Sequence, residues 1–452
     1  MQSVGTRKIS GSLIKILLLS IALVGCKAHF EQLGMKIEID RRVMSNGLQV
    51  LMIEDHSVPV VSYQTWFRVG SVDEKFGATG LAHLFEHLMF KGTEKYGAKQ
   101  FFTQLEAKGA EVNAYTTRDH TVYYENFISE LLPKVIDMEA DRMTGLILNP
   151  DVVNTERMVV LEERKMRTDN SPAGKIQEAL WALAYRVHPY HWPTVGYEPD
   201  VMQVPVEAVQ EFYRRFYQPV NAVLIIAGDF DPDMTYSQIE KAYGAIPKGK
   251  KNTRADIPAE PEQKEEHRLV LRDQVASELL AIGYHITAAE NDDSYAIDVL
   301  SNILFNGNSS RAHQLMVEKK DLVIGVSGAS FTPLYPGLLM ISTAMKGNAP
   351  AEDAEKLLDQ LIREIQEKGV TQEEVQIAVK QLTVQLVDSI RSSFGIAQLL
   401  GAVMMVFDDH ERLVDDLNKY LKVTPEDVKK AAAKYLVPNN RSVVIMKSEK
   451  KP

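Results

Sequence analysis

The second half of the chain repeats the first half at one constant offset. The segment VPVEAVQEFYRRFYQPVNAVLII at 204–226 returns as VTPEDVKKAAAKYLVPNNRSVVI at 423–445, which aligns Pro219 with Pro438 and Asn221 with Asn440. Self-similarity at a fixed period indicates that one structural unit has been built twice. The length of 452 residues also exceeds what one hydrophobic core ordinarily serves. The sequence therefore predicts two related domains.

A polar segment separates the two copies. It reads PKGKKNTRADIPAEPEQKEE, contains three prolines and many charges, and is typical of a connection between domains. We expect a first domain at 38–246, a linker at 247–266 and a second domain at 267–448. Runs rich in β-branched and aromatic residues alternate with helical periodicity in the first domain, which predicts a mixture of strands and helices.

Residues 1–25 are typical of a bacterial signal peptide. Positive charges precede the apolar run ILLLSIALVGC, which is too short for a comfortable membrane span. The run ends in Leu-Val-Gly-Cys, which resembles the lipobox of bacterial lipoproteins. We therefore expect cleavage before Cys26, attachment to the membrane through lipid on that cysteine, and an N-terminal tether at 26–37. Lys27 follows, whereas an aspartate there would favour the inner membrane, so the expected location is the periplasmic face of the outer membrane in a Gram-negative bacterium. An ordinary signal peptide with a chance cysteine is the alternative.

Composition argues against a nucleic-acid surface. The formal net charge is −10 at pH 7, and phosphate binding requires a clustered basic face. A hydrophobic share of 45% and a charged share of 25% are typical of a folded globular protein.

The stretch HLFEHLMFKGT at 83–93 places two histidines and a glutamate in an apolar run. Positions i and i+4 of a helix lie on one face, so His83 and His87 can reach one metal ion together. Glu86 emerges beside the same face, where a carboxylate can hold a water molecule and take its proton. Histidines of an apolar helix can instead be ordinary core or capping residues. A zinc site used for hydrolysis also needs a third protein ligand.

A third ligand is available downstream, where ERMVVLEE offers Glu156, Glu162 and Glu163 on one predicted helix. Glu156 and Glu163 are seven residues apart and share a face, whereas Glu162 points away from it. The offset of the repeat places Asn302 and Asn306 where the first copy has its histidines. We therefore expect one Zn2+ ion per chain, bound in the first half.

These residues resemble those of the M16 metallopeptidases, the pitrilysin family that includes mitochondrial processing peptidase and insulin-degrading enzyme. That family carries His-x-x-Glu-His and, at a fixed spacing after the second histidine, a further glutamate. Counted from His87, that spacing ends at Glu163 in this chain. Another family glutamate, seven residues before that ligand, matches Glu156. The resemblance covers about 38–448. It implies an α+β fold of the M16 (LuxS/MPP-like) type, with two homologous α/β domains that each hold a mostly antiparallel sheet flanked by helices.

The resemblance also implies a role for each residue. His83, His87 and Glu163 would bind zinc. Glu86 would be the general base toward a water on the zinc ion, and Glu156 would orient one of the ligands. The implied activity is that of a metalloendopeptidase that hydrolyses peptides or unfolded segments.

The segment GAEVNAYTTRDHTVYY resembles the edge strand of the family's active site, to which the main chain of a peptide substrate is added as a further strand. Asn113 and Ala114 fall on that strand's motif and are the expected substrate-binding residues. The nearby Arg118 and His120, and His56 further upstream, are expected on surface loops.

One departure from the family concerns the second half. Active members carry an arginine and, seven residues later, a tyrosine in a stretch that resembles SSRxxQxxREKRGLAYSV. This chain reads SSRAHQLMVEKKDLVIGV, with Val317 and Ile324 at those positions. The resemblance implies that the missing pair grips the substrate and stabilises the oxyanion. We therefore expect a heterodimer with a sister M16 subunit that carries the arginine and tyrosine. A peptidase that acts alone is one alternative, and a non-catalytic zinc-binding assembly subunit of a periplasmic complex is another.

Overall fold

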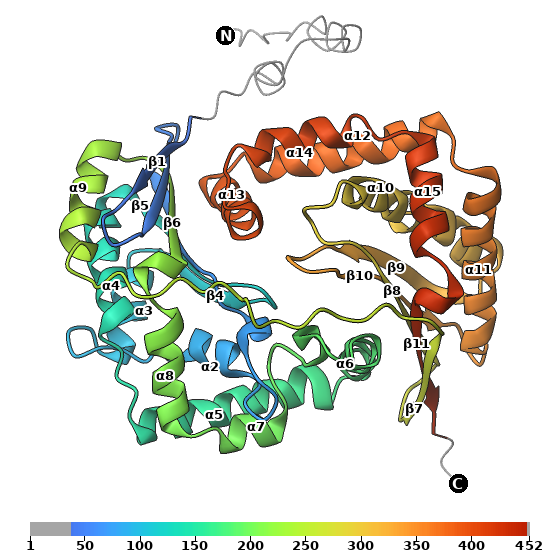
Figure 1. Cartoon of the computed structure of the whole chain (residues 1–452), viewed down its shortest axis with the longest axis horizontal. Helices are drawn as coiled ribbons and strands as arrows, with labels where there is room; N and C mark the ends of the chain where they lie inside the picture. The colour runs from blue at the N-terminus through green and yellow to red at the C-terminus, as the bar shows by residue number, and fades with distance from the viewer. Residues whose placement is uncertain (1–37, 450–452) are drawn as a thin grey trace, which may run out of the picture. The chain divides into compact units, whose positions relative to one another are not determined.

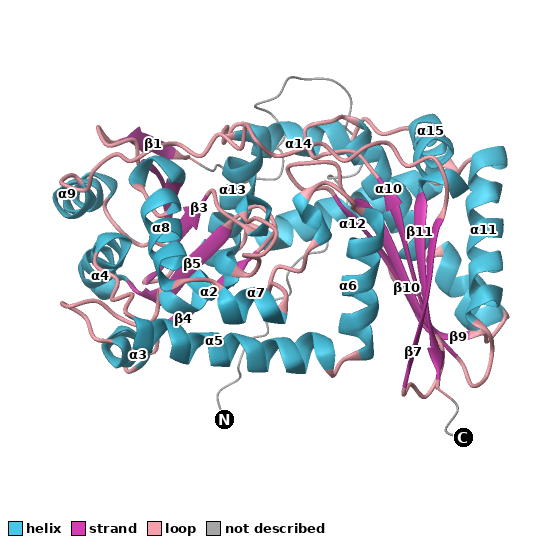
Figure 2. Ribbon diagram, turned by 60° about the horizontal axis from the view of Figure 1, so that its bottom comes forward, coloured by secondary structure: helices cyan, strands magenta, loops and turns pink. Residues whose placement is uncertain are grey.

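A computed structural model describes residues 38–449, which include a six-stranded sheet and a five-stranded sheet flanked by helices (Figure 1, Figure 2). The first sheet is built from the first copy of the repeat, and the second sheet from the second copy. The expected signal peptide, the tether and the lipid-bearing Cys26 lie outside the described residues.

The strands of the first sheet are β1 (Asp40–Val43), β2 (Gln49–Glu54), β3 (Val60–Phe67), β4 (Glu111–Thr116), β5 (Thr121–Ile128) and β6 (Ala222–Gly228). Their spatial order is β1-β2-β6-β3-β5-β4, and each pairing is antiparallel except that of β2 with β6. β6 reads AVLIIAG and is buried at every residue, as expected for a strand that is covered on both faces. β4 is an edge strand, so one side of its backbone is open.

The helices of the first half are α2 (Leu81–Leu88), α3 (Ala98–Glu106), α4 (Leu132–Thr144), α5 (Pro150–Arg164), α6 (Pro172–Ala184), α7 (Glu198–Gln203), α8 (Val206–Phe216) and α9 (Pro232–Tyr243). Single 3-10 turns lie at Ser71–Asp73, Ser129–Leu131, Pro189–His191 and Pro219–Asn221. α5 begins at a local signal, because the side chain of Asn149 accepts a hydrogen bond of 2.9 Å from the N–H of Val152 and Pro150 occupies the first turn. The C-terminal end of α5 passes into a π-helix at Lys165–Asp169.

The second sheet has the strands β7 (His267–Asp273), β8 (Leu279–His285), β9 (Val323–Phe331), β10 (Leu338–Met345) and β11 (Arg441–Ser448), in the order β7-β11-β8-β10-β9. Its helices are α10 (Asp293–Phe305), α11 (Ala351–Lys368), α12 (Gln372–Ser389), α13 (Ser393–Phe407), α14 (Arg412–Tyr420) and α15 (Pro425–Tyr435), with a π-helix at His313–Lys319 and a 3-10 turn at Pro438–Asn440. α15 repeats α8 at the offset of the sequence repeat, and β11 pairs with β7 in parallel as β6 pairs with β2. The predicted α+β class, with two related halves that each hold a mostly antiparallel sheet flanked by helices, is confirmed.

Each sheet is covered by a helix from the opposite half. α6 packs against β7, β8 and β11 of the second sheet, and α13 packs against β3 and β6 of the first sheet (Figure 1). α13 approaches so closely that a Cβ atom on Gly401 would lie 2.0 Å from Cε2 of Trp66. Tyr115 of β4 donates a hydrogen bond of 2.6 Å to the side-chain oxygen of Gln398 in α13. The second half therefore contributes directly to the surroundings of the edge strand β4.

The tip of the hairpin between β4 and β5 is enclosed, against expectation. The guanidinium carbon of Arg118 lies 3.6 Å from the ring centre of Trp181 in α6, and the ring of His120 lies 5.1 Å from that of Trp66. Both residues lie in a loop, as expected, but they are half-buried rather than exposed. A planar guanidinium stacks favourably on an indole ring, which an assignment by polarity alone does not consider. His56 is exposed, as expected.

In the part of the chain that the structure describes, no single helix has both the length and the apolar character needed to cross a membrane. α12 and α13 meet that requirement only as a pair, and their axes are bent by 115° at the break between them.

Candidate metal centre and substrate cleft

α2 presents the His-x-x-Glu-His motif from a helix that is anchored in the first core. Phe85 and Leu88, on the side of the helix away from the metal donors, are buried in that core and hold the helix in place. Gly80 precedes the helix with a φ of 87°, and the carboxylate of Glu74 accepts hydrogen bonds of 2.8 Å from the N–H groups of Gly80 and Ala82. These two N–H groups have no acceptor inside the helix. A carboxylate at the N-terminal end of a helix also interacts favourably with the helix dipole. Glu74 therefore fixes where α2 begins.

His83, His87 and Glu163 converge on one point. Nε2 of His87 lies 3.1 Å from Oε2 of Glu163, and Nε2 of His83 lies 3.7 Å from the same oxygen. One donor atom from each residue lies within 4.8 Å of the other two. Donors of a tetrahedral zinc site, with ligand bonds near 2.0–2.1 Å, are about 3.3 Å apart. Two imidazoles and one carboxylate are also a common donor set in zinc sites with an open fourth position, so the residues present fit a zinc ion.

Glu156 holds the second histidine in place. Oε1 of Glu156 accepts a hydrogen bond of 2.9 Å from Nδ1 of His87, which turns Nε2 of that ring toward Glu163. Oε2 of Glu156 lies 2.5 Å from Nζ of Lys91, so this buried carboxylate, which is 2% exposed, also has a cationic partner. Nδ1 of His83, by contrast, is buried without a hydrogen-bond partner among residues 38–449. The seven-residue spacing in α5 thus places Glu156 behind His87 and Glu163 in front of it.

Glu162 stays apart from the donor cluster, whereas Arg167 forms an ion pair with Glu163. Glu162 is 66% exposed, lies 3.6 Å from Nζ of Lys165 and stays apart from the donor cluster. Arg167 places NH1 at 2.7 Å from Oε1 of Glu163, while the other oxygen of that carboxylate faces the histidines. Sequence reasoning missed Arg167, although its spacing of four residues from Glu163 on one helix was an available signal.

The surroundings shift the pKa values of the two histidines in opposite directions. Burial and the charge of His87 lower the pKa of His83 to about 4. Burial also opposes the protonation of His87, but its hydrogen bonds with Glu156 and Glu163 outweigh this and raise its pKa to about 9. The hydrogen bond from His87 lowers the pKa of Glu163 to about 2. Burial raises the pKa of Glu86 above its ordinary value. Without a metal ion, His87 is therefore protonated at neutral pH and forms ion pairs with both Glu156 and Glu163.

An open cleft of about 1040 Å³ lies in front of the donors. Glu86 lines it, as do Asn113 and Ala114 of β4. The N–H of Ala114 donates a hydrogen bond of 2.8 Å to Oδ1 of Asn113, which indicates that this N–H faces the open edge of the sheet rather than β5. The two expected substrate-binding residues thus lie in the same cleft as the three donors.

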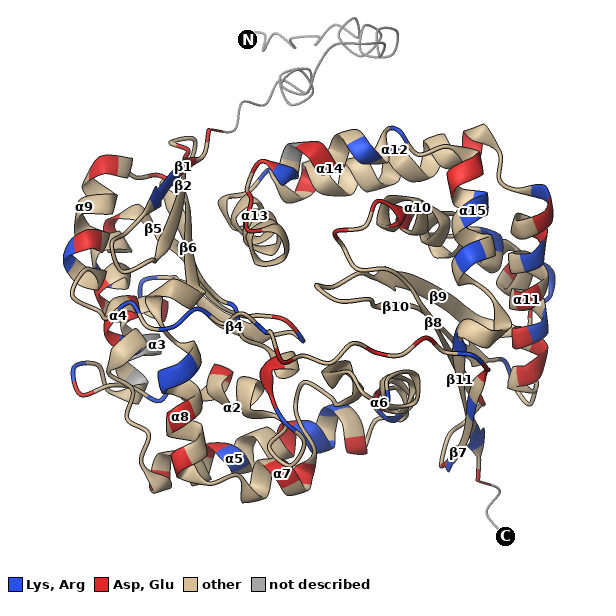
Figure 3. Ribbon diagram, in the orientation of Figure 1, with Lys and Arg blue, Asp and Glu red and all other residues tan. Residues whose placement is uncertain are grey.

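The wall opposite β4 is formed by α5 and the π-helix that follows it. Met158, Val159 and Met166 line the cleft there and are 57%, 46% and 64% exposed. Acidic and basic residues are interspersed along the same helix (Figure 3). Sequence reasoning missed this apolar wall, because apolar residues on a predicted helix are ordinarily assigned to the core.

The repeated positions of the second half carry other side chains. Asn302 is buried in α10, and Asn306 follows directly after that helix. Amide side chains are not among the usual zinc ligands. Val317 is half-buried against the second core, whereas Ile324 on β9 is 67% exposed.

Family models and known relatives agree with this arrangement. The model described as Insulinase (Peptidase family M16) matches residues 49–197, and the model described as Peptidase M16 inactive domain matches residues 203–382. Together the two matches extend over well over half of the chain. The first match contains the donor cluster and Glu86, and the second contains Val317 and Ile324.

Among known proteins, the chain is 29% identical over 410 residues to the zinc protease PqqE of Helicobacter pylori, across 89% of this chain and 91% of that protein. It is 26% identical over 403 residues to the uncharacterized zinc protease SCO5738 of Streptomyces coelicolor, across 87% and 86% of the two chains.

Solved structures show the same similarity. A protease from Helicobacter pylori superposes with a TM-score of 0.86 and 28% identity over 91% of this chain and 100% of that chain. A peptidase M16 inactive domain from Pseudomonas fluorescens, at 20% identity, shares the fold with a TM-score of 0.83 over 92% and 98% of the two chains. The expected pair of M16-type domains is thereby confirmed, and the chain belongs to peptidase family M16.

Proposed function

We propose that this chain is a zinc-dependent endopeptidase that hydrolyses peptides or unfolded segments. The observation that carries the proposal is the convergence of His83, His87 and Glu163 in an open cleft that Glu86 also lines. One bound zinc ion would supply a Lewis acid for the scissile carbonyl and would favour the deprotonation of water near neutral pH. Relatives named as zinc proteases support the same choice of metal.

Glu86 is proposed as the general base. Its carboxylate lines the cleft, and burial raises its pKa, so it accepts a proton more readily than an exposed glutamate does. It would take a proton from the attacking water while the new C–O bond forms, and would pass a proton to the amine nitrogen while the C–N bond breaks. Glu156 would keep His87 oriented during both steps through the contact to Nδ1.

The substrate main chain is proposed to pair with the open edge of β4. Strand addition uses main-chain hydrogen bonds and makes little demand on sequence, which suits peptides and unfolded segments. The outward N–H of Ala114 is one available donor, and Asn113 would have to release it.

The substitution Glu86→Gln tests the proposal, because it keeps the size of the side chain and removes its basicity. We expect the zinc content to stay near that of the wild type, whereas peptide turnover falls by roughly 10²–10⁴. The matched control is Glu162→Gln, which changes an exposed carboxylate of the same cleft that lies outside the donor cluster. Turnover that survives Glu86→Gln would contradict the proposal. Zinc binding without any turnover, even with a partner present, would favour the non-catalytic assembly subunit instead.

We also propose a heterodimer with a sister M16 subunit that supplies an arginine and a tyrosine. Val317 and Ile324 offer no polar group at the positions that the family uses, and loss of one oxyanion donor lowers turnover on the order of 10²–10³. The test compares the pure chain with the chain mixed with its sister subunit. In a second arm, Val317→Arg combined with Ile324→Tyr is expected to raise the turnover of the pure chain. Full activity of the unmodified pure chain would overturn the need for a partner.

We propose that lipid on Cys26 anchors the chain at the periplasmic face of the outer membrane. The support is the lipobox-like end of the apolar N-terminal run. Mass spectrometry of the mature N-terminus should detect an acylated cysteine, and Cys26→Ser should release the protein from the membrane fraction. An unmodified N-terminus at another residue would contradict this location.

A further inference from the structure

We infer that Arg254 is a positioning residue of the proposed active site, where it sets the relative placement of α2 and β4. α2 carries both histidines of the donor cluster, and β4 carries the substrate edge of the cleft. Arg254 belongs to neither element, since it lies in the polar segment between the two halves. The inference rests on the proposed peptidase function of this cleft.

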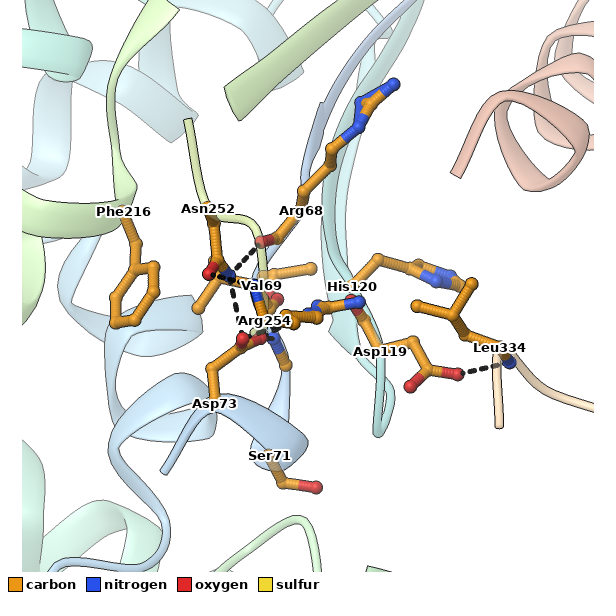
Figure 4. Close-up of polar contacts among 12 residues, drawn as sticks. Arg68, Val69, Ser71, Asp73, Asp119, His120, Phe216, Asn252, Arg254 and Leu334 are labelled. Carbon is orange, nitrogen blue, oxygen red and sulfur yellow. Dashed lines mark hydrogen bonds and ion pairs between the residues drawn. The ribbon is translucent and has the colours of Figure 1, made fainter. Parts of the chain in front are cut away.

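One arm of the network reaches α2. Arg254 forms a two-point ion pair with Asp73, with Nε 2.9 Å from Oδ1 and NH2 2.7 Å from Oδ2. The two side chains are only 9% and 2% exposed. Nδ2 of Asn252 adds a hydrogen bond of 2.7 Å to Oδ1 of Asp73 (Figure 4). Asp73 directly precedes Glu74, whose carboxylate accepts from the N–H of Gly80 at the start of α2. A displacement of Asp73 is therefore passed to the helix that bears the two histidines.

The other arm reaches β4. NH2 of Arg254 also donates to the main-chain oxygen of Asp119, in the tight turn that joins β4 to β5. The N–H of Val72 donates a hydrogen bond of 2.8 Å to the main-chain oxygen of Arg118 in the same turn. The approach is so close that a Cβ atom on Gly70 would lie 2.4 Å from that oxygen. Within residues 38–449 β4 pairs with β5 alone, so the placement of this turn bears on the placement of the substrate edge.

The second half holds the same turn from another side. Oδ2 of Asp119 accepts a hydrogen bond of 3.0 Å from the N–H of Leu334, in the loop between β9 and β10 (Figure 4). The hydroxyl of Tyr190 donates to Oδ1 of Asp119 at 2.7 Å. The guanidinium of Arg254 and the carboxylate of Asp119 thus join three parts of the chain, and the second half contributes to the cleft through them.

The backbone of Arg254 points to more than an ordinary ion pair. Its φ is +52°, in the left-handed region that a side chain with a Cβ atom seldom adopts. Such conformations are strained, persist where the surroundings fix them, and gather at functional sites. Glycine would relieve this strain, but it would lose the contacts to Asp73 and to the turn at Asp119.

The test compares Arg254→Met with Arg441→Met in the full chain. Arg441 on β11 has a side chain that is 7% exposed, against 9% for Arg254, and it forms ion pairs with Glu266, Glu355 and Asp359 in the second half. Arg254→Met removes the cationic partner of Asp73, and Arg441→Met removes one cationic partner from each of its three carboxylates, so both are expected to lower the melting temperature. We expect only Arg254→Met to lower kcat/KM, by at least roughly tenfold, because a shift of about 1 Å in a binding wall can reduce turnover by 10².

Two further readouts require no turnover. Zinc affinity, measured by competition with a chelator, reports the placement of α2. Binding of a fluorescent peptide to the Glu86→Gln variant reports the placement of β4. We expect Arg254→Met to weaken both severalfold and Arg441→Met to leave both unchanged. Arg254→Lys keeps the charge without the two-point geometry and should fall between wild type and Arg254→Met, which also provides the test if the methionine variant fails to fold.

Equal effects of the two methionine variants on zinc affinity and peptide binding would overturn the inference, and so would the absence of any effect of Arg254→Met on a folded chain. If the wild type shows no turnover while Arg254→Met still weakens both forms of binding, the peptidase function fails and the positioning role stands.

Discussion

Nδ1 of His87 lies 2.9 Å from Oε1 of Glu156. Because Nδ1 of His87 is held by Glu156, Nε2 is the ring nitrogen that faces Glu163. His83 has no such support, because its Nδ1 is buried without a hydrogen-bond partner in the described part of the chain. The two imidazoles of the donor cluster are therefore unequal, and His87 is the more firmly held of the two.

Removal of the charge on Glu156 should therefore weaken metal binding without touching a ligand. Glu156→Gln keeps the length of the side chain but replaces the ionised acceptor of His87, and it also leaves Lys91 without its anionic partner. We expect zinc affinity to fall by roughly 10–100-fold, as is typical for residues that orient a metal ligand. Competition with a chelator at constant pH measures the change. Glu162→Gln serves as the control on the same helix, and equal affinities of the two variants would argue against an orienting role for Glu156.

Zinc binding should release about one proton at neutral pH. In the metal-free chain the pKa of His87 is raised to about 9 and that of His83 is lowered to about 4, while the pKa of Glu163 is about 2. At pH 7 only His87 must therefore lose a proton to become a ligand. The logarithm of the affinity should rise by about one for each pH unit between pH 6 and 8 and level off above pH 9. Calorimetry in buffers of different ionisation enthalpy counts the protons released. A count near zero would show that His87 is neutral before the metal arrives.

Local signals carried much of what could be predicted. The sequence carries a helix-start signal at Asn149 and Pro150, and the side chain of Asn149 does cap α5. The internal repeat predicted a second copy of α8, which is present as α15. Spacing along one helix face and the family pattern favoured Glu163 over Glu162 as the third donor. The structure brings Glu163 to the histidines and leaves Glu162 exposed.

Contacts between distant segments left no comparable signal. Arg254 and Asp73 are 181 residues apart, and an arginine in a polar, proline-containing segment gives no local sign of a buried partner. The apolar faces of α6 and α13 predict that each helix is covered, but not that each covers the sheet of the opposite half. Arg118 was assigned to the surface by its charge, whereas Trp181, which it stacks on, belongs to another element of the fold.

Proline at position 114 should separate peptide binding from metal binding. The N–H of Ala114 faces the open edge of β4, so Ala114→Pro removes a donor that pairing with β5 does not use. A lost main-chain hydrogen bond is worth about 0.5–1.5 kcal/mol. Because the ring also hinders an incoming strand, we expect KM to rise roughly tenfold while zinc affinity stays unchanged. Ala114→Ser keeps the N–H and is the control. If steady-state kinetics give the same KM for both variants, the substrate does not pair at this position.

Because α13 of the second half packs on the first sheet, one methyl group added to α13 is predicted to destabilise the protein. A Cβ atom on Gly401 of α13 would lie 2.0 Å from Cε2 of Trp66 on β3, so Gly401→Ala forces the helix away from the first sheet. Overpacking of this kind reduces the free energy of unfolding by about 1–3 kcal/mol. The displacement should also loosen the hydrogen bond from Tyr115 to Gln398 and thereby disturb β4. Denaturant titration measures the stability. Gly325→Ala is the control, because in the described part of the chain no atom beyond the two neighbouring residues lies within 4 Å of a Cβ atom at that position. It should leave stability unchanged or slightly higher. A Gly401→Ala variant as stable as the wild type would show that α13 is not packed on the first sheet in solution.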